Sequence, residues 1–452
     1  MMNKKNLLPL IGCQSALALM VGFPVEVSAK KKTQTPEKPN FIIIMSDDMG
    51  YSDIGCFGSD YINTPNLDRM AQEGMMLTDY HSNGPVSTPT RAALMTGRYQ
   101  QRAGLEHVLL TADEKARKSG LKQEEVTFAE ILKENGYNVA MFGKWHLGYE
   151  RQFCPPVHGF DEYIGFHAGN VDYKAFIDQQ GRPDWWKWET PADTTGYLTQ
   201  IINRLGMDYI KRNDGTPFCL YLAHGCPHSP YQGPDDPALR EVGSSKFVRS
   251  EREDKDMVYK EMIEFLDKEI GLLMDGLKEK GIDRNTMVIF VSDNGPTGPG
   301  EAGRFRGKKG DVFEGGHRVP AIVRMPGAIK AGSVSDETVM TMDILPTMLD
   351  YAGITYENKE KPLDGSSFRS VLENGKMHKR PVFWRYGKGK AVRLGDWKYI
   401  ENRVGKKGKT RTQCFLFNLK DDPEEQHNLI NQRPKQVQKL KSLLEQWEKD
   451  VE

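Results

Sequence analysis

The sequence has no excess charge of either sign and no internal repeat. Lys+Arg and Asp+Glu each number 62 in 452 residues, so the formal net charge is zero. This balance gives no overall field that would draw the protein to nucleic acid, so no such partner is expected and any anion must bind locally. Hydrophobic residues make up 38% and charged residues 27%, as in ordinary globular proteins. The length allows one large domain and a smaller one.

Cysteine is also scarce. There are six cysteines, of which Cys13 lies close to the N-terminus, and no CxxC pair is present. The number and spacing of the rest are not those of a disulfide framework or a zinc site. One bridge between Cys219 and Cys226 and a set of buried free thiols both fit the pattern.

The N-terminus has the order of a targeting signal. Two lysines precede a mostly apolar run, Leu7–Phe23, and the small residues Val27–Ala29 follow it. This order is typical of a secretory signal peptide over residues 1–29, followed by a Lys-, Thr- and Pro-rich linker over 30–39.

Two other interpretations of the N-terminus differ in their consequences. A membrane anchor is disfavoured because Pro9 and Pro24 limit the run, so no transmembrane segment is expected in the mature chain. Leu10–Cys13 resembles a bacterial lipobox, which would place a lipid on Cys13. We expect a secreted protein, with a lipid anchor as the alternative.

The remaining sequence predicts an α/β fold with a large, mostly parallel central sheet flanked by helices. Short, continuous apolar runs are typical of strands buried on both faces. Helical patterns lie between these runs, as parallel sheets require. The region 40–360 is therefore predicted as the main domain, and 361–452 as a smaller subdomain of antiparallel strands and one helix. The runs are 40–45, 217–223 and 287–291; the helical patterns are 64–73, 127–135, 255–278 and 343–351; the final helix is 434–448.

Acidic residues follow two of the predicted strands directly. Asp47 and Asp48 come after the first run, and Asp293 and Asn294 come after the third. Functional groups gather at the carboxyl ends of parallel strands. A pair of adjacent carboxylates is commonly a turn cap, but two such pairs with only oxygen ligands favour a Ca²⁺ or Mg²⁺ site.

Ser87 begins a segment with the chemistry of a helix start. It stands at the predicted N-cap, Pro89 lies in the first turn, and Arg91 follows one turn on. A helix N-terminus offers N–H groups and positive potential to an anion. Local chemistry alone fits an ordinary capped helix equally well.

The segment Pro85–Gly97 resembles the signature of the sulfatases, the formylglycine-dependent type I family of the alkaline phosphatase superfamily. The signature is Cys or Ser, any residue, Pro, any residue, Arg, a short spacer and Thr-Gly. Further segments resemble the family's landmarks in order, so the resemblance covers nearly all of the chain from residue 40 onward. They are Thr64–Asp68, Gly143–Gly148, His224–Pro230, Arg306–Gly316, Asp396–Lys398 and Leu416–Leu429.

The resemblance implies a set of site residues and cofactors. Ser87 would be oxidised to Cα-formylglycine, and a Ser precursor implies a bacterial host with a radical-type sulfatase-maturing enzyme, so the expected compartment is the bacterial periplasm. The doubled lysine, Lys308–Lys309, departs from the family, and the spacing to Glu314 favours Lys309. The implied Ca²⁺ ligands are Asp47, Asp48, modified Ser87, Asp293 and Asn294, and the implied catalytic residues are Ser87, Arg91, Lys144, His146, His228 and Lys309.

The implied roles suit hydrolysis of a sulfate ester. Cations offset the charge that builds up when a nucleophile approaches an anionic sulfur centre. One hydroxyl of an aldehyde hydrate attacks sulfur, and the other expels sulfate. His228 would protonate the leaving alcohol, and His146 would assist at the hydrate.

The substrate is predicted by analogy. His158–Asp161 resembles the branch of the family that acts on sulfated galactose or N-acetylgalactosamine, so we expect an exo-acting enzyme on sulfated glycans. Two alternatives remain: a phosphate or phosphonate ester hydrolase of the same superfamily, and an unmodified protein that only binds glycans. Candidate substrate contacts are His107, His167, Asp172 and Trp186.

Overall fold

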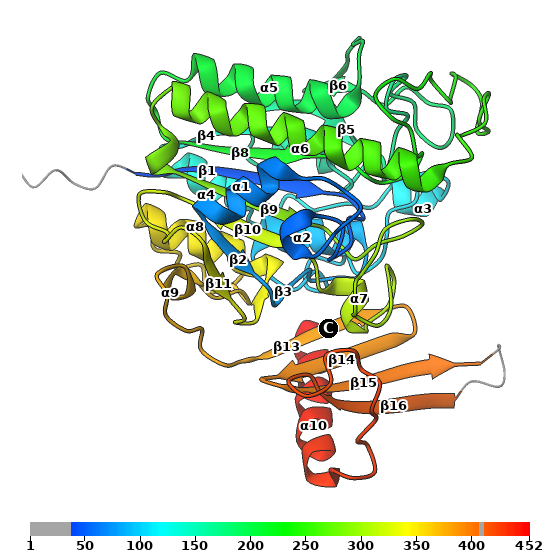
Figure 1. The fold of residues 1–452 in the computed structure, drawn as a ribbon, viewed down its shortest axis with the longest axis vertical. Coiled ribbons are helices and arrows are strands. Elements are labelled where there is room, and N and C mark those ends of the chain that lie inside the picture. The colour runs from blue at the N-terminus through cyan, green and yellow to red at the C-terminus, as the bar shows by residue number, and fades with distance from the viewer. Residues whose placement is uncertain (1–37, 406–410) are drawn as a thin grey trace, which may run out of the picture. The chain divides into compact units, whose positions relative to one another are not determined.

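The central sheet is built around β1 (Asn40–Ser46) in a computed structural model that describes residues 38–405 and 411–452. The predicted signal peptide, most of the linker and Cys13 lie outside the described residues. β1 pairs in parallel with β8 (Phe218–Ala223) on one side and β9 (Thr286–Ser292) on the other. These are the three apolar runs of the sequence, now seen as neighbouring buried strands (Figure 1).

The sheet has ten strands and is mostly parallel, as predicted. β4 (Asn138–Lys144) continues the parallel set beside β8, while β10 (Ala321–Arg324) runs antiparallel to β9. The order is β11-β2-β10-β9-β1-β8-β4-β5-β6-β7. The outer strands are β11 (Ser333–Ser335), β2 (Met75–Leu77), β5 (Glu162–Phe166), β6 (Trp186–Lys187) and β7 (Thr190–Pro191).

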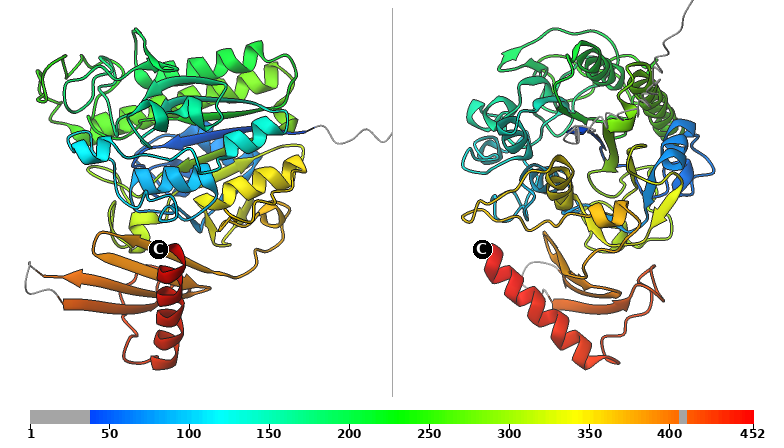
Figure 2. Two further views of the ribbon diagram at one scale, coloured as in Figure 1. Left: turned by 180° about the vertical axis from the view of Figure 1, so that it is seen from behind. Right: turned by 90° about the vertical axis from the view of Figure 1, so that its left-hand side faces the viewer.

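Helices cover both faces of this sheet (Figures 1 and 2). Alternate residues of β1 point to opposite faces: Ile43 packs with α2, α4 and α8, and Ile44 packs with α1, α5 and α6. Thr127 caps α4 through a capping box with Glu130. The bounds are α1 Pro65–Glu73, α2 Ser87–Thr96, α4 Phe128–Glu134, α5 Leu198–Arg212, α6 Lys255–Glu279 and α8 Ile344–Ala352.

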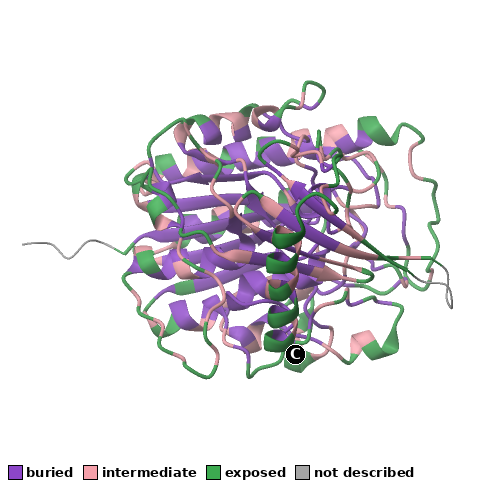
Figure 3. Ribbon diagram, turned by 90° about the horizontal axis from the view of Figure 1, so that it is seen from below, coloured by how far each residue is buried: buried purple, intermediate pink, exposed green. Residues whose placement is uncertain are grey.

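A separate antiparallel sheet of four strands follows, as predicted for the C-terminal region. Leu440, Leu444 and Trp447 of the last helix, α10 (Pro434–Val451), are buried against it, and the helix's outer side is exposed (Figure 3). Residues 38–452 form one compact unit, so the boundary near residue 360 stays a prediction. The strands are β13 (Pro381–Tyr386), β14 (Gly389–Leu394), β15 (Trp397–Val404) and β16 (Arg411–Asn418).

The remaining short elements include a two-stranded parallel sheet of β3 and β12 and three short helices. They are β3 (Tyr80–His81), β12 (Val339–Met340), α3 (Glu114–Arg117), α7 (Glu314–His317) and α9 (Arg369–Leu372).

Two expectations about the chain can be compared with the described residues. The five cysteines between positions 38 and 452 are free, and no Cys219–Cys226 bridge is formed. Within 38–405 and 411–452, no helix combines the length and apolar character that crossing a membrane requires.

Candidate active site

The predicted acidic residues meet at the carboxyl ends of two neighbouring strands. β1 and β9 run in register, with Ser46 beside Ser292, so the residues that follow each strand lie together. The backbone N–H of Asp48 donates to Asp293 Oδ1 at 3.1 Å. Carboxylate oxygens of Asp47, Asp48 and Asp293 lie within 4.8 Å of one another, and all three residues are buried.

Asn294 adds an amide oxygen to this cluster. Its Nδ2 donates to Asp48 Oδ1 at 2.8 Å and to the Gly295 carbonyl at 2.9 Å, which fixes the amide orientation. Its Oδ1 then lies 3.5 Å from Ser87 Oγ. Three carboxylates and an amide are hard oxygen donors, which fit a calcium ion and are unsuited to zinc.

A second group with metal-binding residue types is already internally bonded. His81, Glu314 and His317 are buried and close together. Glu314 Oε1 accepts from Lys398 Nζ at 2.8 Å, and the two imidazole Nδ1 atoms lie 3.0 Å apart as a hydrogen-bonded pair. These groups satisfy one another, so the oxygen cluster is the better candidate for a metal.

Ser87 lies beside the oxygen cluster at the start of α2. The helix begins at Ser87 with Val86 in the N-cap position, one residue earlier than the predicted cap. Ser87 Oγ lies 3.2 Å from Asp47 Oδ1 and 3.3 Å from Lys144 Nζ. The residue is only 1% exposed, so its hydroxyl faces charged side chains with little competition from water.

Three cations neutralise the cluster. Lys144 Nζ lies 2.6 Å from Asp47 Oδ2, and Arg91 Nη2 lies 2.9 Å from Asp293 Oδ2. Lys309 Nζ, which enters from the loop before α7, lies 2.6 Å from Asp48 Oδ1. Burial by itself would raise the pKa of the Asp47 carboxyl, but Lys144, with His228 and Arg91, holds it below its ordinary value. The carboxylates therefore stay ionised.

His146 is held next to Ser87 by its surroundings. Its Nε2 can only donate to the Leu109 carbonyl, 3.2 Å away, which leaves Nδ1 as the unprotonated nitrogen with no partner among the described residues. Burial, with Lys144 and Arg91 nearby, lowers the pKa of His146 well below its usual range. A Cβ on Gly169 would lie 2.9 Å from the imidazole, so this position requires glycine.

His228 faces the same cluster from the loop after β8. Its Nδ1 donates to the Ser229 carbonyl at 2.6 Å, and its Nε2 lies 3.5 Å from Asp48 Oδ2. Burial lowers the pKa of His228, and the two carboxylates Asp48 and Asp47 oppose that effect. Nε2 is thus the nitrogen available to a ligand.

Two of these residues have a strained backbone. Asp48 has φ 64° and His146 has φ 55°, in the left-handed region that non-glycine residues rarely adopt. Such strain persists where the surrounding structure enforces it, and it concentrates at functional sites.

A pocket of about 440 Å³ opens onto the cluster, within the usual range for small-ligand sites. Ser87, His146, His228 and Lys309 line its inner part, so the structure brings together four of the predicted catalytic residues. Its outer part includes His107, as predicted, whose ring packs edge-on against Tyr386 at 6.1 Å between centroids. The prediction missed Val108–Thr111, Gln179 and Tyr386, which come from loops and a strand end without a motif.

The other three predicted substrate contacts do not line this pocket. The Asp172 carboxylate is buried and accepts backbone N–H groups, including that of Leu239 at 2.7 Å. His167 is buried in a stack between Tyr163 and Trp186, with centroids 5.7 and 5.2 Å away. Trp186 Nε1 donates to Asp184 Oδ1 at 2.7 Å, and the same oxygen accepts from the backbone N–H of His167, so these residues hold the loop together.

Comparison with known proteins assigns the family. The sulfatase family model matches residues 39–354, and the model for the C-terminal region of N-sulphoglucosamine sulphohydrolase matches residues 300–450. The chain therefore belongs to the sulfatase family and is a sulfuric ester hydrolase.

Relatives and solved structures agree with this assignment. N-acetylgalactosamine-6-sulfatase of Canis lupus familiaris is 35% identical over 391 residues, which cover 80% of this chain and 72% of the relative. Arylsulfatase A of Bos taurus is 31% identical, with 90% and 87% covered. The crystal structure of Ps i-CgsB in complex with k-i-k-neocarrahexaose has a TM-score of 0.80 at 29% identity, with 92% and 94% covered.

Proposed function

We propose that this sulfatase acts on sulfated glycans through a formylglycine formed from Ser87 and a calcium ion. The observation that carries the proposal is the position of Ser87 Oγ, 3.2 Å from Asp47 and 3.3 Å from Lys144. A nucleophile formed at this position would stand between a metal-type oxygen cluster and a lysine ammonium. The remaining residues then have roles set by what they contact.

Asp47, Asp48, Asp293 and Asn294, together with the modified Ser87, would hold the calcium ion. When bound, Ca²⁺ supplies a fixed positive charge that offsets the negative charge of a sulfate ester. Arg91 contacts Asp293 and lies 3.7 Å from Asp47, so it keeps these two carboxylates in place. Lys309 lies at the pocket wall, so its ammonium group could leave Asp48 and bind a sulfate oxygen instead.

The burial of Ser87 limits when a maturing enzyme can modify it. As a hydrate, formylglycine supplies one hydroxyl that can act on sulfur and a second that permits release. Ser87 is 1% exposed, so a radical-type sulfatase-maturing enzyme would have to reach it before the chain folds. Lys144 Nζ, 3.3 Å from Oγ, then stabilises an oxygen at this position once folding is complete.

The two histidines divide the proton transfers. His228 Nδ1 is occupied by the Ser229 carbonyl, so a proton on Nε2 is directed into the pocket, toward a leaving alcohol oxygen. His146 carries its proton on Nε2 and leaves Nδ1 free to accept one. Because Nδ1 of His228 already carries a proton, donation from its Nε2 requires the doubly protonated imidazolium, whereas His146 acts as the neutral ring; acid and base functions are therefore separated by protonation state.

The substrate class is supported by both relatives and geometry. The relatives include N-acetylgalactosamine-6-sulfatases and a structure in complex with a carrahexaose. A pocket of about 440 Å³ accommodates one sugar ring, and His107, Gln179 and Tyr386 at its mouth can contact the ring edges. We therefore propose exo action on a terminal galactose or N-acetylgalactosamine sulfate. Export to the bacterial periplasm, with or without a lipid on Cys13, completes the proposal.

Paired substrates test the reaction. Matured enzyme should turn over 4-nitrophenyl sulfate far faster than 4-nitrophenyl phosphate, and should release sulfate from N-acetylgalactosamine 6-sulfate or a sulfated galactose. Equal or faster phosphate ester turnover would favour a phosphate or phosphonate ester hydrolase. That comparison matters because the phosphonate monoester hydrolase of Agrobacterium radiobacter shares the fold, with a TM-score of 0.67 at 19% identity. Tight glycan binding without turnover of any ester would favour the binding protein instead.

A further inference from the structure

A second pocket lies between the large-sheet region and the C-terminal sheet. Its volume is about 770 Å³, and none of the candidate catalytic or metal residues lines it. Arg380, just before β13, borders this pocket, whereas Tyr386, at the end of β13, borders the catalytic pocket. Val382, four residues before Tyr386, also borders the second pocket. A strand rises about 3.3 Å per residue, so roughly 13 Å of chain separates the two pockets. We call the second one the junction pocket.

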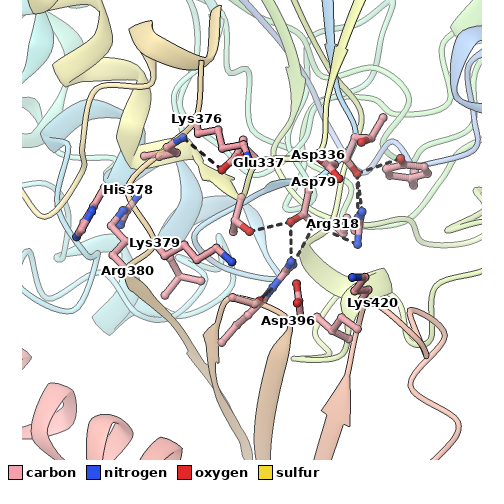
Figure 4. A pocket seen from close by; sticks show the side chains of 18 of the residues that line it. Asp79, Arg318, Asp336, Glu337, Lys376, His378, Lys379, Arg380, Asp396 and Lys420 are labelled. Atoms are coloured by element: carbon pink, nitrogen blue, oxygen red, sulfur yellow. Dashed lines mark hydrogen bonds and ion pairs between the residues drawn. The ribbon is translucent and has the colours of Figure 1, made fainter. Parts of the chain in front are cut away.

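The inner part of the junction pocket is an ion pair that is already satisfied. Asp79 accepts from Arg393 Nη2 at 2.7 Å and from Arg318 Nη1 at 3.1 Å (Figure 4). Burial alone would raise the pKa of Asp79, but the two guanidinium groups hold it well below its usual range. This triad forms a rigid polar surface that joins β14 to the large-sheet region.

The rim of the pocket differs, because most of its charged groups form no ion pair with another described residue; Arg380, which pairs with Asp343, is an exception. Arg304, Lys376, Lys379 and Lys420 are exposed, and none of them forms an ion pair within residues 38–405 and 411–452. Figure 4 shows Lys379 and Lys420 on opposite sides of Asp396. The carboxylates of Asp336, Glu337 and Asp396 likewise form no ion pair with a cation in the described part of the chain. The rim thus offers unpaired cationic donors beside carboxylates that have no cationic partner among the described residues; one of these carboxylates, Glu337, accepts from the Met377 backbone N–H at 3.3 Å.

Cations and carboxylates on the same rim favour a ligand that carries both anionic groups and hydroxyls. Ammonium and guanidinium groups bind sulfate oxygens, while carboxylates accept hydrogen bonds from sugar hydroxyls. A nucleic acid carries a phosphate on every residue, which leaves few uncharged groups to face the three rim carboxylates, whereas a sulfated glycan has hydroxyls between its sulfates. We propose that the junction pocket is a non-catalytic binding site for a second segment of a sulfated polysaccharide. The assignment of a sulfated glycan rests on the proposed function.

A second site of this kind would hold a polymer near the catalytic pocket. Once one segment is bound at the junction, the effective concentration of chain ends around Ser87 rises without any new contact in the active site. A small aryl sulfate bound in the catalytic pocket is too short to reach the junction pocket, so its turnover would not depend on the junction pocket.

Binding stoichiometry in the full chain tests the proposal. The probe is a carrageenan hexasaccharide, titrated by calorimetry into the Ser87→Ala variant, which cannot turn it over. The change is Lys379→Glu with Lys420→Glu in that same background. The matched control is Lys211→Glu with Lys268→Glu, which reverses two exposed lysines of α5 and α6. We expect the junction variant to lose one bound hexasaccharide per chain, or to bind it about tenfold more weakly at low salt. The control should behave like the parent.

The outcomes separate this proposal from the catalytic one. If the catalytic pocket does not bind this sugar, the parent binds one equivalent and the junction variant none, which still supports the junction site. The proposal is overturned if the parent binds no hexasaccharide, or if the junction variant binds as many equivalents as the parent with unchanged affinity. Equally tight binding of a single-stranded oligonucleotide of the same charge would also overturn it. Matured Lys379→Glu/Lys420→Glu enzyme should hydrolyse 4-nitrophenyl sulfate at the wild-type rate.

Discussion

Lys398 connects the C-terminal sheet to α7 and to the loop after β16 through buried charges, and its removal should weaken the fold more than any surface change. The residue lies in β15 with no exposed side-chain surface, and its Nζ lies 2.8 Å from Glu314 Oε1 and 2.9 Å from Glu425 Oε1. Both carboxylates are equally buried. Removing one partner of a buried pair costs about 3–5 kcal/mol, because the remaining charge is left unpaired. Lys398→Met keeps most of the side-chain volume, so the loss comes mainly from charge.

A double variant isolates the electrostatic part. Burial raises the pKa of Glu425 to about 7, so Glu425→Gln mimics the protonated, uncharged side chain, whose burial costs less free energy than that of the carboxylate. We expect Lys398→Met to lose about 3–5 kcal/mol in guanidinium unfolding followed by tryptophan fluorescence. Lys398→Met with Glu425→Gln should recover part of that loss. A loss under about 1 kcal/mol in the single variant would refute the reasoning, because surface-like pairs cost no more than that.

Three further changes test individual contacts. Burial lowers the pKa of His158 to about 4, so between pH 4 and the unfolded pKa of about 6.5 the folded state binds fewer protons than the unfolded state. The free energy of unfolding therefore has its full value above about pH 6.5 and decreases as the pH falls toward 4. His158→Gln should flatten that acid-side loss by up to about 3 kcal/mol in unfolding curves, and an unchanged slope would contradict it. Gly169→Ala should place a methyl 2.9 Å from the His146 ring and lower turnover about 100-fold with little change in unfolding midpoint; wild-type turnover would show that the ring position is unimportant. His228→Gln should cost about 10²–10⁴ in kcat on a sugar sulfate and much less on 4-nitrophenyl sulfate, whose leaving group needs no proton; equal losses on both would argue against a proton donor.

Much of the architecture follows from local sequence patterns. The runs that became β1, β8 and β9 are apolar throughout because helices cover both faces of the sheet. The same parallel arrangement brings Asp47 and Asp293 together, because both follow strands that are paired in register. Helix limits agreed within a few residues where a cap or a glycine marks them, as at Gly353 after α8.

The mouth of the active site could not be predicted in the same way. Gln179 and Thr111 reach the pocket from loops, and Tyr386 reaches it from the last position of β13. No periodicity or motif marks such positions, since they are set by how the C-terminal sheet docks. His167 and Trp186 show the reverse case: both were candidate substrate contacts, but their rings stack on each other with centroids 5.2 Å apart.

The junction pocket also escapes sequence reasoning. Asp79, Arg318 and Arg393 are far apart along the chain and meet only in the folded protein. In the sequence, its basic residues are spread over several loops and look like ordinary solvated charges. Only the fold shows that they surround one cavity.

The central claim is that sulfate ester hydrolysis depends on a modified Ser87, and one paired measurement tests it. Preparations made with increasing amounts of maturing enzyme are compared by mass spectrometry of the Ser87 peptide and by 4-nitrophenyl sulfate turnover. We predict that turnover rises in proportion to the fraction of peptide that has lost two hydrogens, and extrapolates to zero when serine is unmodified. Full turnover by protein carrying only unmodified serine would contradict the account.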